Sequence, residues 1–303
     1  MLDLNFLSVL DEKAEFLYRF SDDIWAHPET AFTEFHAAER YCAVLRSEGF
    51  AVTEGLAGIP TAFSGRFGSG RPVIGILAEF DALSGLSKEG GLTEQRSAGG
   101  DCGHGCGHNL LGMASLGAAL MTGTKVEIDF VKACSDTVLN DTLQRALYEK
   151  MAQIGVPEIT AADEAYAREL TQKALMEYPK ADPAHPIHAA LLPYTGQIEY
   201  ECGSTDVGDV SWLCPTVQTK TATWAFGTPG HSWQTVTQGV MPLAHKMTLY
   251  AAKSLAALGA ELMVNAGLLA QAKQEHRRLV GPEGYVCPIP EGVRPRSMQS
   301  LHK

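Results

Sequence analysis

The chain has 303 residues, and its 24 lysines and arginines against 35 aspartates and glutamates give a formal net charge of −11. So acidic a balance argues against a nucleic-acid-binding surface. Hydrophobic residues make up 45% of the chain and charged residues 19%, which is an ordinary globular composition and excludes disorder. No uninterrupted apolar run reaches the roughly 18 residues of a membrane span.

The first eight residues carry no positive charge ahead of their apolar side chains, so no secretory leader is predicted. The chain contains seven cysteines, an odd number in a chain far larger than a disulfide-stapled miniprotein. We therefore expect most of the thiols to be free in a reducing compartment, and the protein to be cytoplasmic.

The first third of the chain reads as two helices followed by two strands. Apolar side chains recur at helical spacing over residues 11–26 and again over residues 34–48, where Gly49 provides a stop signal. Residues 62–67 predict a strand, and the continuous apolar run 73–77 predicts a neighbouring central strand that is buried on both faces. This order favours an α/β fold.

Two carboxylates, Glu79 and Asp81, follow directly after the predicted central strand. The carboxyl ends of strands in open α/β sheets are where ligands bind, so these side chains are candidates for a site. The alternative is that they cap a loop and face water.

Cysteines and histidines then alternate with glycines between Cys102 and His108, just before a small-residue apolar run that starts at Leu110. Thiolate and imidazole are the donors that zinc prefers, and the glycines allow a short loop to bend around one ion. Two of the four side chains are expected to bind, with distant residues completing an open site. Chance clustering of buried thiols is the alternative.

The second half of the chain alternates between predicted strands and predicted helices. Residues 125–130 predict a strand with one wet face. Helices are predicted after the polar stop at Asn140 and Asp141 and again after Thr160, which is a good N-cap with Asp163 three positions on. Residues 222–226 predict a buried strand that leads through a glycine-proline turn to His231. A long amphipathic helix is predicted over residues 241–262.

Three motifs together resemble one family, the zinc amidohydrolases and metallopeptidases related to carboxypeptidase G, aminoacylase and the indole-acetyl-amino-acid hydrolases. The residues that carry this resemblance occur in the family's order over nearly the whole chain. The first motif is Ala78, Glu79, Phe80, Asp81, Ala82, Leu83; the second is His104, Gly105, Cys106, Gly107, His108, Asn109; and the third is Ser204, Thr205, Asp206, Val207, Gly208, Asp209 together with Gly230, His231, Ser232.

The resemblance implies an α/β catalytic domain with a mixed central sheet flanked by helices. It implies metal ligation by Cys106, His108 and His231, with Zn²⁺, or alternatively Mn²⁺, as the cofactor. Asp81 and Glu79 are assigned to the catalytic centre, where Asp81 orients the metal site. The residues assigned to its surroundings without binding the ion are Asp206, Asp209 and His104.

The resemblance also implies a feature that this chain lacks. Relatives carry a Glu-Glu-Gly segment, whose glutamates supply the general base and a ligand, and an inserted lid domain that forms the dimer. No Glu-Glu-Gly occurs in this sequence, and residues 117–121 lead straight into the predicted strand. We therefore expect an internal deletion of about 100 to 200 residues, roughly one domain.

This interpretation divides the chain into residues 1–121 as the first part of the catalytic domain, 122–140 as a remnant strand of the lid domain, and 141–303 as the second part. The expected partners are a small-molecule N-acyl amino acid and a sister subunit or second copy, without nucleic acid or membrane.

Three functions remain open from the sequence. The first is a metal-dependent amidohydrolase that cleaves the amide of an N-acyl amino acid, such as aminobenzoyl-glutamate, or of a dipeptide. The second is an inactive, internally deleted remnant that binds metal weakly, because a missing general base alone costs about 10² to 10⁴ in rate. The third is a redox or structural zinc protein that uses the cysteine and histidine alternation.

Overall fold

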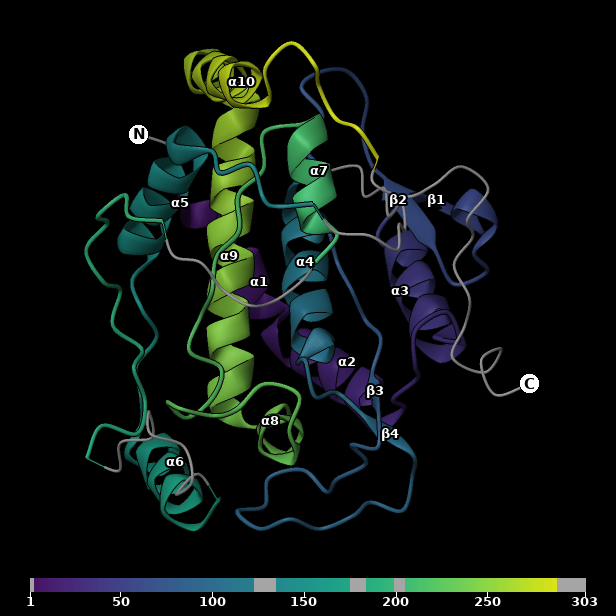
Figure 1. The fold of residues 1–303 in the computed structure, drawn as a ribbon, viewed down its shortest axis with the longest axis vertical. Coiled ribbons are helices and arrows are strands. Elements are labelled where there is room, and N and C mark those ends of the chain that lie inside the picture. Colours follow the sequence, from purple (N-terminus) through teal and green to yellow (C-terminus); the bar gives the residue numbers. More distant parts are fainter. Residues whose placement is uncertain (1–2, 123–134, 175–183, 199–204, 288–303) are drawn as a thin grey trace.

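The computed structural model describes residues 3–122, 135–174, 184–198 and 205–287. In these ranges the fold is rich in helices and contains two small sheets (Figure 1). The helices are α1 (Ser8–Glu12), α2 (Ala14–Ala26), α3 (Phe35–Ser47), α4 (His108–Thr122), α5 (Asp141–Ile154), α6 (Ala161–Ala174), α7 (Val207–Leu213), α8 (Trp233–Gln238), α9 (Pro242–Val264) and α10 (Ala266–Val280). The strands are β1 (Ala51–Glu54), β2 (Phe63–Arg66), β3 (Leu83–Ser84) and β4 (Cys102–Gly103), and short 3₁₀ turns lie at Asn5–Leu7 and Leu56–Gly58.

The main core is built around α4 and α9, which run side by side through the centre of the molecule (Figure 1). Small side chains allow the two helices to approach closely: Ala118 of α4 and Ala252 and Ala256 of α9 are completely buried. The apolar stripe of α2, including Leu17, covers one side of this pair. The helix predicted over residues 11–26 is thus confirmed, beginning at Ala14.

A second apolar cluster packs α5 and α10 against α9 along nearly its whole length, from Leu243 to Leu262. Leu147 and Met151 of α5 are buried there against Tyr250 of α9. The helix predicted after Asn140 is confirmed as α5, and Asn140 caps it, because Asn140 Oδ1 accepts the Leu143 N–H at 3.0 Å. The predicted cap of α6 is confirmed too, because Thr160 and Asp163 exchange hydrogen bonds in a capping box.

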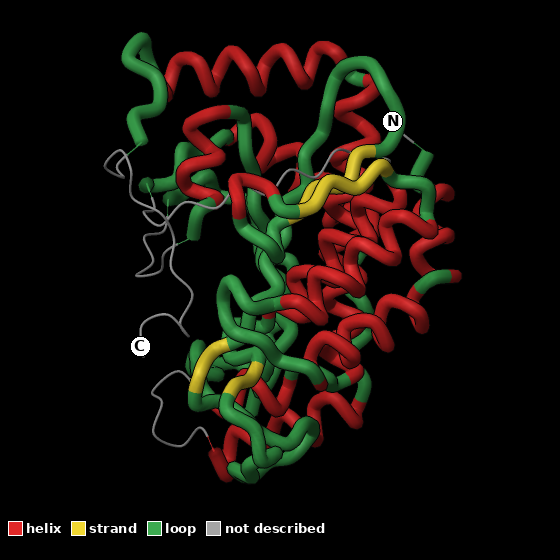
Figure 2. The backbone as a smooth tube through the Cα atoms, turned by 90° about the vertical axis from the view of Figure 1, so that its right-hand side faces the viewer, coloured by secondary structure: helices red, strands yellow, loops and turns green. Residues whose placement is uncertain are grey.

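The two sheets are short antiparallel hairpins that lie apart from each other (Figure 2). In the first, β1 pairs with β2, with Ala51 opposite Arg66. In the second, β3 pairs with β4, with Leu83 opposite Gly103. The prediction of a strand at residues 62–67 is confirmed, but its neighbour is β1 rather than residues 73–77.

The mixed central sheet that the resemblance implies is not found among the described residues. Residues 73–77 and 222–226, both predicted as buried strands, form no ladder there, and Val73 is 51% exposed. The physical reason is that a strand must pair its backbone N–H and C=O groups with another segment. An apolar run supplies no such partner, so these two predictions are wrong for this structure.

Several predictions lie outside what the structure tests. The strand predicted at residues 125–130 falls outside the described residues, as does Ser204 of the third motif. The division into 1–121, 122–140 and 141–303 also stays a prediction. Helix α9, which confirms the helix predicted at 241–262, is long and apolar enough to cross a membrane, but 61% of its most apolar window is buried inside the protein. Such burial is typical of a core helix.

Candidate active site

His108 begins α4 and lies between two carboxylates. Its Nδ1 is 2.7 Å from Asp81 Oδ1, and its Nε2 is 3.1 Å from Glu79 Oε2. The turn into the helix is made by Gly107 at φ +75°, and a side chain there would come within 2.8 Å of the Trp224 ring. Glycine is therefore required just before His108 both for backbone conformation and for space.

The two carboxylates control the charge of this imidazole. Burial disfavours the imidazolium, but hydrogen bonds and charge from Asp81 and Glu79 outweigh burial and raise the pKa of His108 to about 10. The hydrogen bond from His108 is in turn the main reason that the pKa of Glu79 is lowered, against the effect of its burial. The three side chains thus form one electrostatic unit.

A third carboxylate, Asp206, joins the unit from just before α7. Burial first, and then the charge of Glu79, raise the pKa of Asp206 to about 6, and the two carboxyl groups share a hydrogen bond. Thr205 Oγ1 donates to the other Glu79 oxygen, Oε1, at 3.2 Å. Two neighbouring carboxyls with pKa values shifted in opposite directions are a common acid and base arrangement in hydrolytic sites.

Cys106 is half-buried near the same charges. Burial, and then the negative charges of Asp81 and Glu79, raise the pKa of its thiol to about 11. The thiol and the carboxylates oppose one another's ionisation, and together with the imidazole they form a donor set whose negative charge a divalent cation would neutralise. The chemistry of these residues therefore fits a zinc-like ion.

His231 reaches this region through its backbone. It follows the turn at residues 227–230, has φ +55°, and donates its N–H to the Gly105 carbonyl at 3.1 Å. The loop around Cys106 and the distant His231 turn are thus in contact, although the His231 side chain is exposed. Positive φ is uncommon for a residue other than glycine and often marks functional loops.

Two other predicted residues have partners elsewhere. His104 is 1% exposed, its Nε2 lies 3.1 Å from the Ile24 carbonyl of α2, and burial lowers its pKa to about 4. Asp209 accepts hydrogen bonds from Ser135 Oγ at 2.7 Å and from the Tyr285 hydroxyl at 2.9 Å. His104 therefore fastens the cysteine-histidine loop to α2, and Asp209 fastens α7 to one segment before it and one after it in the chain.

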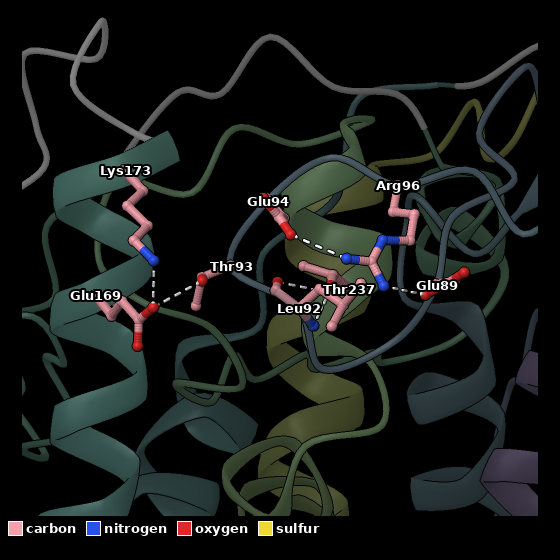
Figure 3. Close-up of polar contacts among 8 residues, drawn as sticks. All are labelled: Glu89, Leu92, Thr93, Glu94, Arg96, Glu169, Lys173 and Thr237. Carbon is pink, nitrogen blue, oxygen red and sulfur yellow. Dashed lines mark hydrogen bonds and ion pairs between the residues drawn. The ribbon is translucent and has the colours of Figure 1, made fainter.

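The segment between the two halves of the site, residues 85–101, is fixed at its midpoint (Figure 3). Thr237 of α8 holds Leu92 by hydrogen bonds of 2.9 Å to both its N–H and its carbonyl. Thr93 donates to Glu169 of α6 at 3.0 Å, and Glu169 also pairs with Lys173. These contacts position the connection from Asp81 to the cysteine-histidine loop.

The structure brings together Glu79, Asp81, Cys106, His108 and Asp206, but it does not gather the predicted ligands Cys106, His108 and His231 into one tight set. Among the described residues, the group whose ligand atoms all lie within 4.8 Å of one another is Asp23, His27 and His36. The role of the predicted ligands stays a prediction. Thr205 was not predicted as a partner of Glu79, although its position beside Asp206 pointed to it.

No family profile matches the chain. It is 27% identical to a subunit of p-aminobenzoyl-glutamate hydrolase from Escherichia coli K12, over 92% of this chain and 95% of that protein. It is 31% identical to human Xaa-Arg dipeptidase over 41% of this chain and 28% of that protein. The solved structure of an aminohydrolase from Staphylococcus aureus has a TM-score of 0.35 at 22% identity, covering 41% of this chain and 33% of that one, which is too low to define a shared fold.

The first of these alignments is longer than this chain. It spans 460 positions, whereas this chain has 303 residues, so at least 157 aligned positions have no residue here. That number of positions is comparable to the size of one domain, and the internal deletion expected from the motifs stays a prediction. The similarity covers 92% of this chain. It confirms the predicted resemblance to the amidohydrolases and peptidases that include p-aminobenzoyl-glutamate hydrolase.

Proposed function

We propose that this protein is a metal-dependent amidohydrolase that cleaves the amide of an N-acyl amino acid, with p-aminobenzoyl-glutamate as the first substrate to test, or of a dipeptide. The observation that carries the proposal is the similarity to the p-aminobenzoyl-glutamate hydrolase subunit over 92% of the chain. The grouping of His108, Asp81, Glu79 and Asp206 supports it, because hydrolysis of an amide needs groups that hold and move protons.

In this proposal Cys106, His108 and His231 hold the metal. The bound ion would supply a Lewis acid for the amide carbonyl. Asp81, 2.7 Å from His108 Nδ1, holds the ring in one orientation, with Nε2 directed at Glu79 Oε2 at 3.1 Å, and the ion would take the place of this Nε2 contact. The His231 turn is joined to Gly105, the neighbour of Cys106, by a backbone hydrogen bond, which supports this assignment.

The carboxyl pair Glu79 and Asp206 takes the place of the Glu-Glu-Gly glutamates in this proposal. The pKa of Asp206, raised to about 6, lies close to neutral pH, where a group both accepts and returns a proton. Glu79 lies between Asp206 and His108 and links proton movement to the imidazole. The leaving amine must receive a proton, and the Glu79 and Asp206 pair is the source that we assign.

We also propose that a missing lid domain accounts for the aligned positions that have no residue in this chain. The protein is proposed to act in the cytoplasm, and a sister subunit or a second copy is proposed to complete the site. The relative from Escherichia coli is itself named as a subunit, which supports the last of these proposals.

The test is release of the amino acid from p-aminobenzoyl-glutamate and a panel of N-acyl amino acids and dipeptides. We expect release by protein supplied with Zn²⁺ or Mn²⁺, its loss after chelation, and its return when metal is added. No release from any substrate with either metal, in protein shown to be folded, would instead establish the inactive-remnant alternative.

A further inference from the structure

A group of two histidines and one carboxylate lies outside the candidate active site, where α2 ends and α3 begins. Asp23 is in the last turn of α2, His27 directly follows that helix, and His36 is in the first turn of α3. Their ligand atoms all lie within 4.8 Å of one another. Two imidazoles and a carboxylate are a common donor set for zinc and for the neighbouring divalent transition metals.

Two of the three distances between these donor atoms match a tetrahedral ion. Two donors that each lie about 2.05 Å from a tetrahedral zinc are about 3.3 Å apart. Asp23 Oδ1 is 3.2 Å from His27 Nδ1 and 3.4 Å from His36 Nε2. The same carboxylate oxygen therefore lies at ligand spacing from both ring nitrogens, and an ion bound at His27 Nδ1 would replace the hydrogen bond of that nitrogen to the Asp23 backbone carbonyl at 2.8 Å.

One of these nitrogens lacks the partner that burial normally demands. His36 Nε2 is shielded from solvent and makes no hydrogen bond, and leaving such a nitrogen unsatisfied costs free energy. The neighbouring His27 and His36 rings, whose centroids are 4.2 Å apart, do not satisfy it. A metal ion between Asp23 and the two rings would supply the missing partner.

The surrounding residues hold the three donors in place. Arg40 Nε binds the other Asp23 oxygen, Oδ2, at 2.6 Å and leaves Oδ1 directed at the histidines. Glu29 accepts the backbone N–H groups of His36 at 3.0 Å and of Ala37 at 3.1 Å, which fixes the start of α3. Such supporting hydrogen bonds orient ligands in metal sites.

Solvent can reach the group. The side chain of His27 is 55% exposed, that of His36 is 33% exposed and that of Asp23 is 26% exposed. We propose that Asp23, His27 and His36 form a second divalent metal site, with Zn²⁺ as the best match, and with one coordination position open to water.

The site would brace a loop that supports the candidate active site. In the loop from His27 to Glu34, the Glu29 carbonyl accepts a hydrogen bond from the Ala82 N–H at 2.7 Å. In the same loop, the Pro28 carbonyl accepts a hydrogen bond from the Cys102 thiol at 2.9 Å. Ala82 directly follows Asp81 of that site, and Cys102 begins the cysteine-histidine loop that carries Cys106 and His108. A metal that links α2 to α3 would therefore limit the motion of the loop from His27 to Glu34, which contacts both segments.

The test is equilibrium dialysis of the full chain against Zn²⁺, with the bound metal measured by elemental analysis. The variants are His27→Ala, His36→Ala, Cys106→Ser and the control His188→Ala, which removes an exposed histidine elsewhere. Loss of a group that only supports a ligand weakens metal binding about 10- to 100-fold, so loss of a direct ligand should weaken it by more than about 100-fold.

We expect one zinc equivalent to be lost in His27→Ala and in His36→Ala, and to be kept in Cys106→Ser and His188→Ala. Wild-type stoichiometry and affinity in His27→Ala would overturn the proposal. His27→Ala is decisive if His36→Ala fails to fold, because the His27 side chain is largely exposed. If the proposed active site binds no metal, the zinc equivalent that depends on Cys106 is missing, whereas the equivalent bound by Asp23, His27 and His36 is still measured.

Discussion

Asp81 and His108, 27 positions apart in the sequence, meet with Oδ1 and Nδ1 only 2.7 Å apart. The contact joins the residues that follow the 73–77 run to the first residue of α4. A carboxylate in this position fixes the tautomer and the orientation of a histidine that binds metal through its other nitrogen. This contact is the structural basis of the predictions about the site.

Asp81→Asn keeps the shape of the side chain and removes its charge, so metal affinity and hydrolysis should each fall about 10- to 100-fold without loss of folding. The measurement is zinc competition with a chelator beside an activity assay. The matched control is Asp22→Asn, because Asp22 also pairs with a histidine, His245, at 2.9 Å, but away from the site. Equal effects of the two substitutions would contradict a specific role for Asp81.

The Asp206 carboxyl should make stability depend on pH in metal-free protein. Its pKa is raised from 3.8 to about 6, mainly by burial and then by Glu79, so the folded state holds an extra proton between these pH values. The free energy of unfolding should therefore fall as the pH rises through that window. Asp206→Asn should remove this part of the fall.

Urea unfolding of wild type and Asp206→Asn, at pH 4 and at pH 7 with chelator present, measures this effect. The variant should gain stability relative to wild type on going from pH 4 to pH 7. A difference between the two proteins that is the same at both pH values would show that Asp206 does not titrate as described.

Gly112→Ala should destabilise the core of the protein. A Cβ at this position in α4 would overlap the Tyr41 hydroxyl, and Tyr41 is only 3% exposed and has little room to move. Overpacking of this kind costs about 1 to 3 kcal/mol. Gly117→Ala in the same helix is the control, since its nearest neighbours lie at 3.3 Å and the change should stay within about 1 kcal/mol.

Thermal unfolding of the two glycine variants decides the point. A Gly112→Ala protein as stable as Gly117→Ala would mean that Tyr41 does not pack against α4 in this way.

Two helix caps of the same chemistry should differ in their contribution to stability. Asn140 caps α5 and also donates Nδ2 to the Ala272 carbonyl of α10 at 2.9 Å, whereas Asn265 caps α10 at an exposed position. Asn265→Ala should cost about 1 kcal/mol, the usual value of a cap. Asn140→Ala should cost about 1 kcal/mol more, because a buried hydrogen bond between helices is also lost.

Urea unfolding of the two asparagine variants measures this difference. Equal losses would show that the Asn140 contact with α10 contributes nothing.

The sequence predicted well those features that depend on near neighbours. The caps at Asn140 and Thr160 were predictable because a capping side chain and the N–H that it accepts are three residues apart. The stop after α3 was predictable because Gly49 readily adopts positive φ. Helix α10, by contrast, was not predicted, although its cap Asn265 is visible in the sequence.

Features that depend on distant partners were harder to predict. Residues 73–77 have the composition of a central strand, but a strand exists only where another segment pairs with it, and composition does not reveal that segment. The charges around His108 were foreseeable as a group, because Glu79, Asp81 and Cys106 all stand in motifs. The contacts of His104 with Ile24 and of Asp209 with Tyr285 needed the fold.

The central claim is that amide hydrolysis depends on His108 and the groups around it. The most direct test is the rate at which metal-loaded protein releases glutamate from p-aminobenzoyl-glutamate, compared among wild type, His108→Ala and the control His188→Ala. We predict chelator-sensitive release by wild type and His188→Ala, and loss of at least about 100-fold in His108→Ala. Release that persists unchanged in His108→Ala, or that is absent from folded, metal-loaded wild type, would contradict the account.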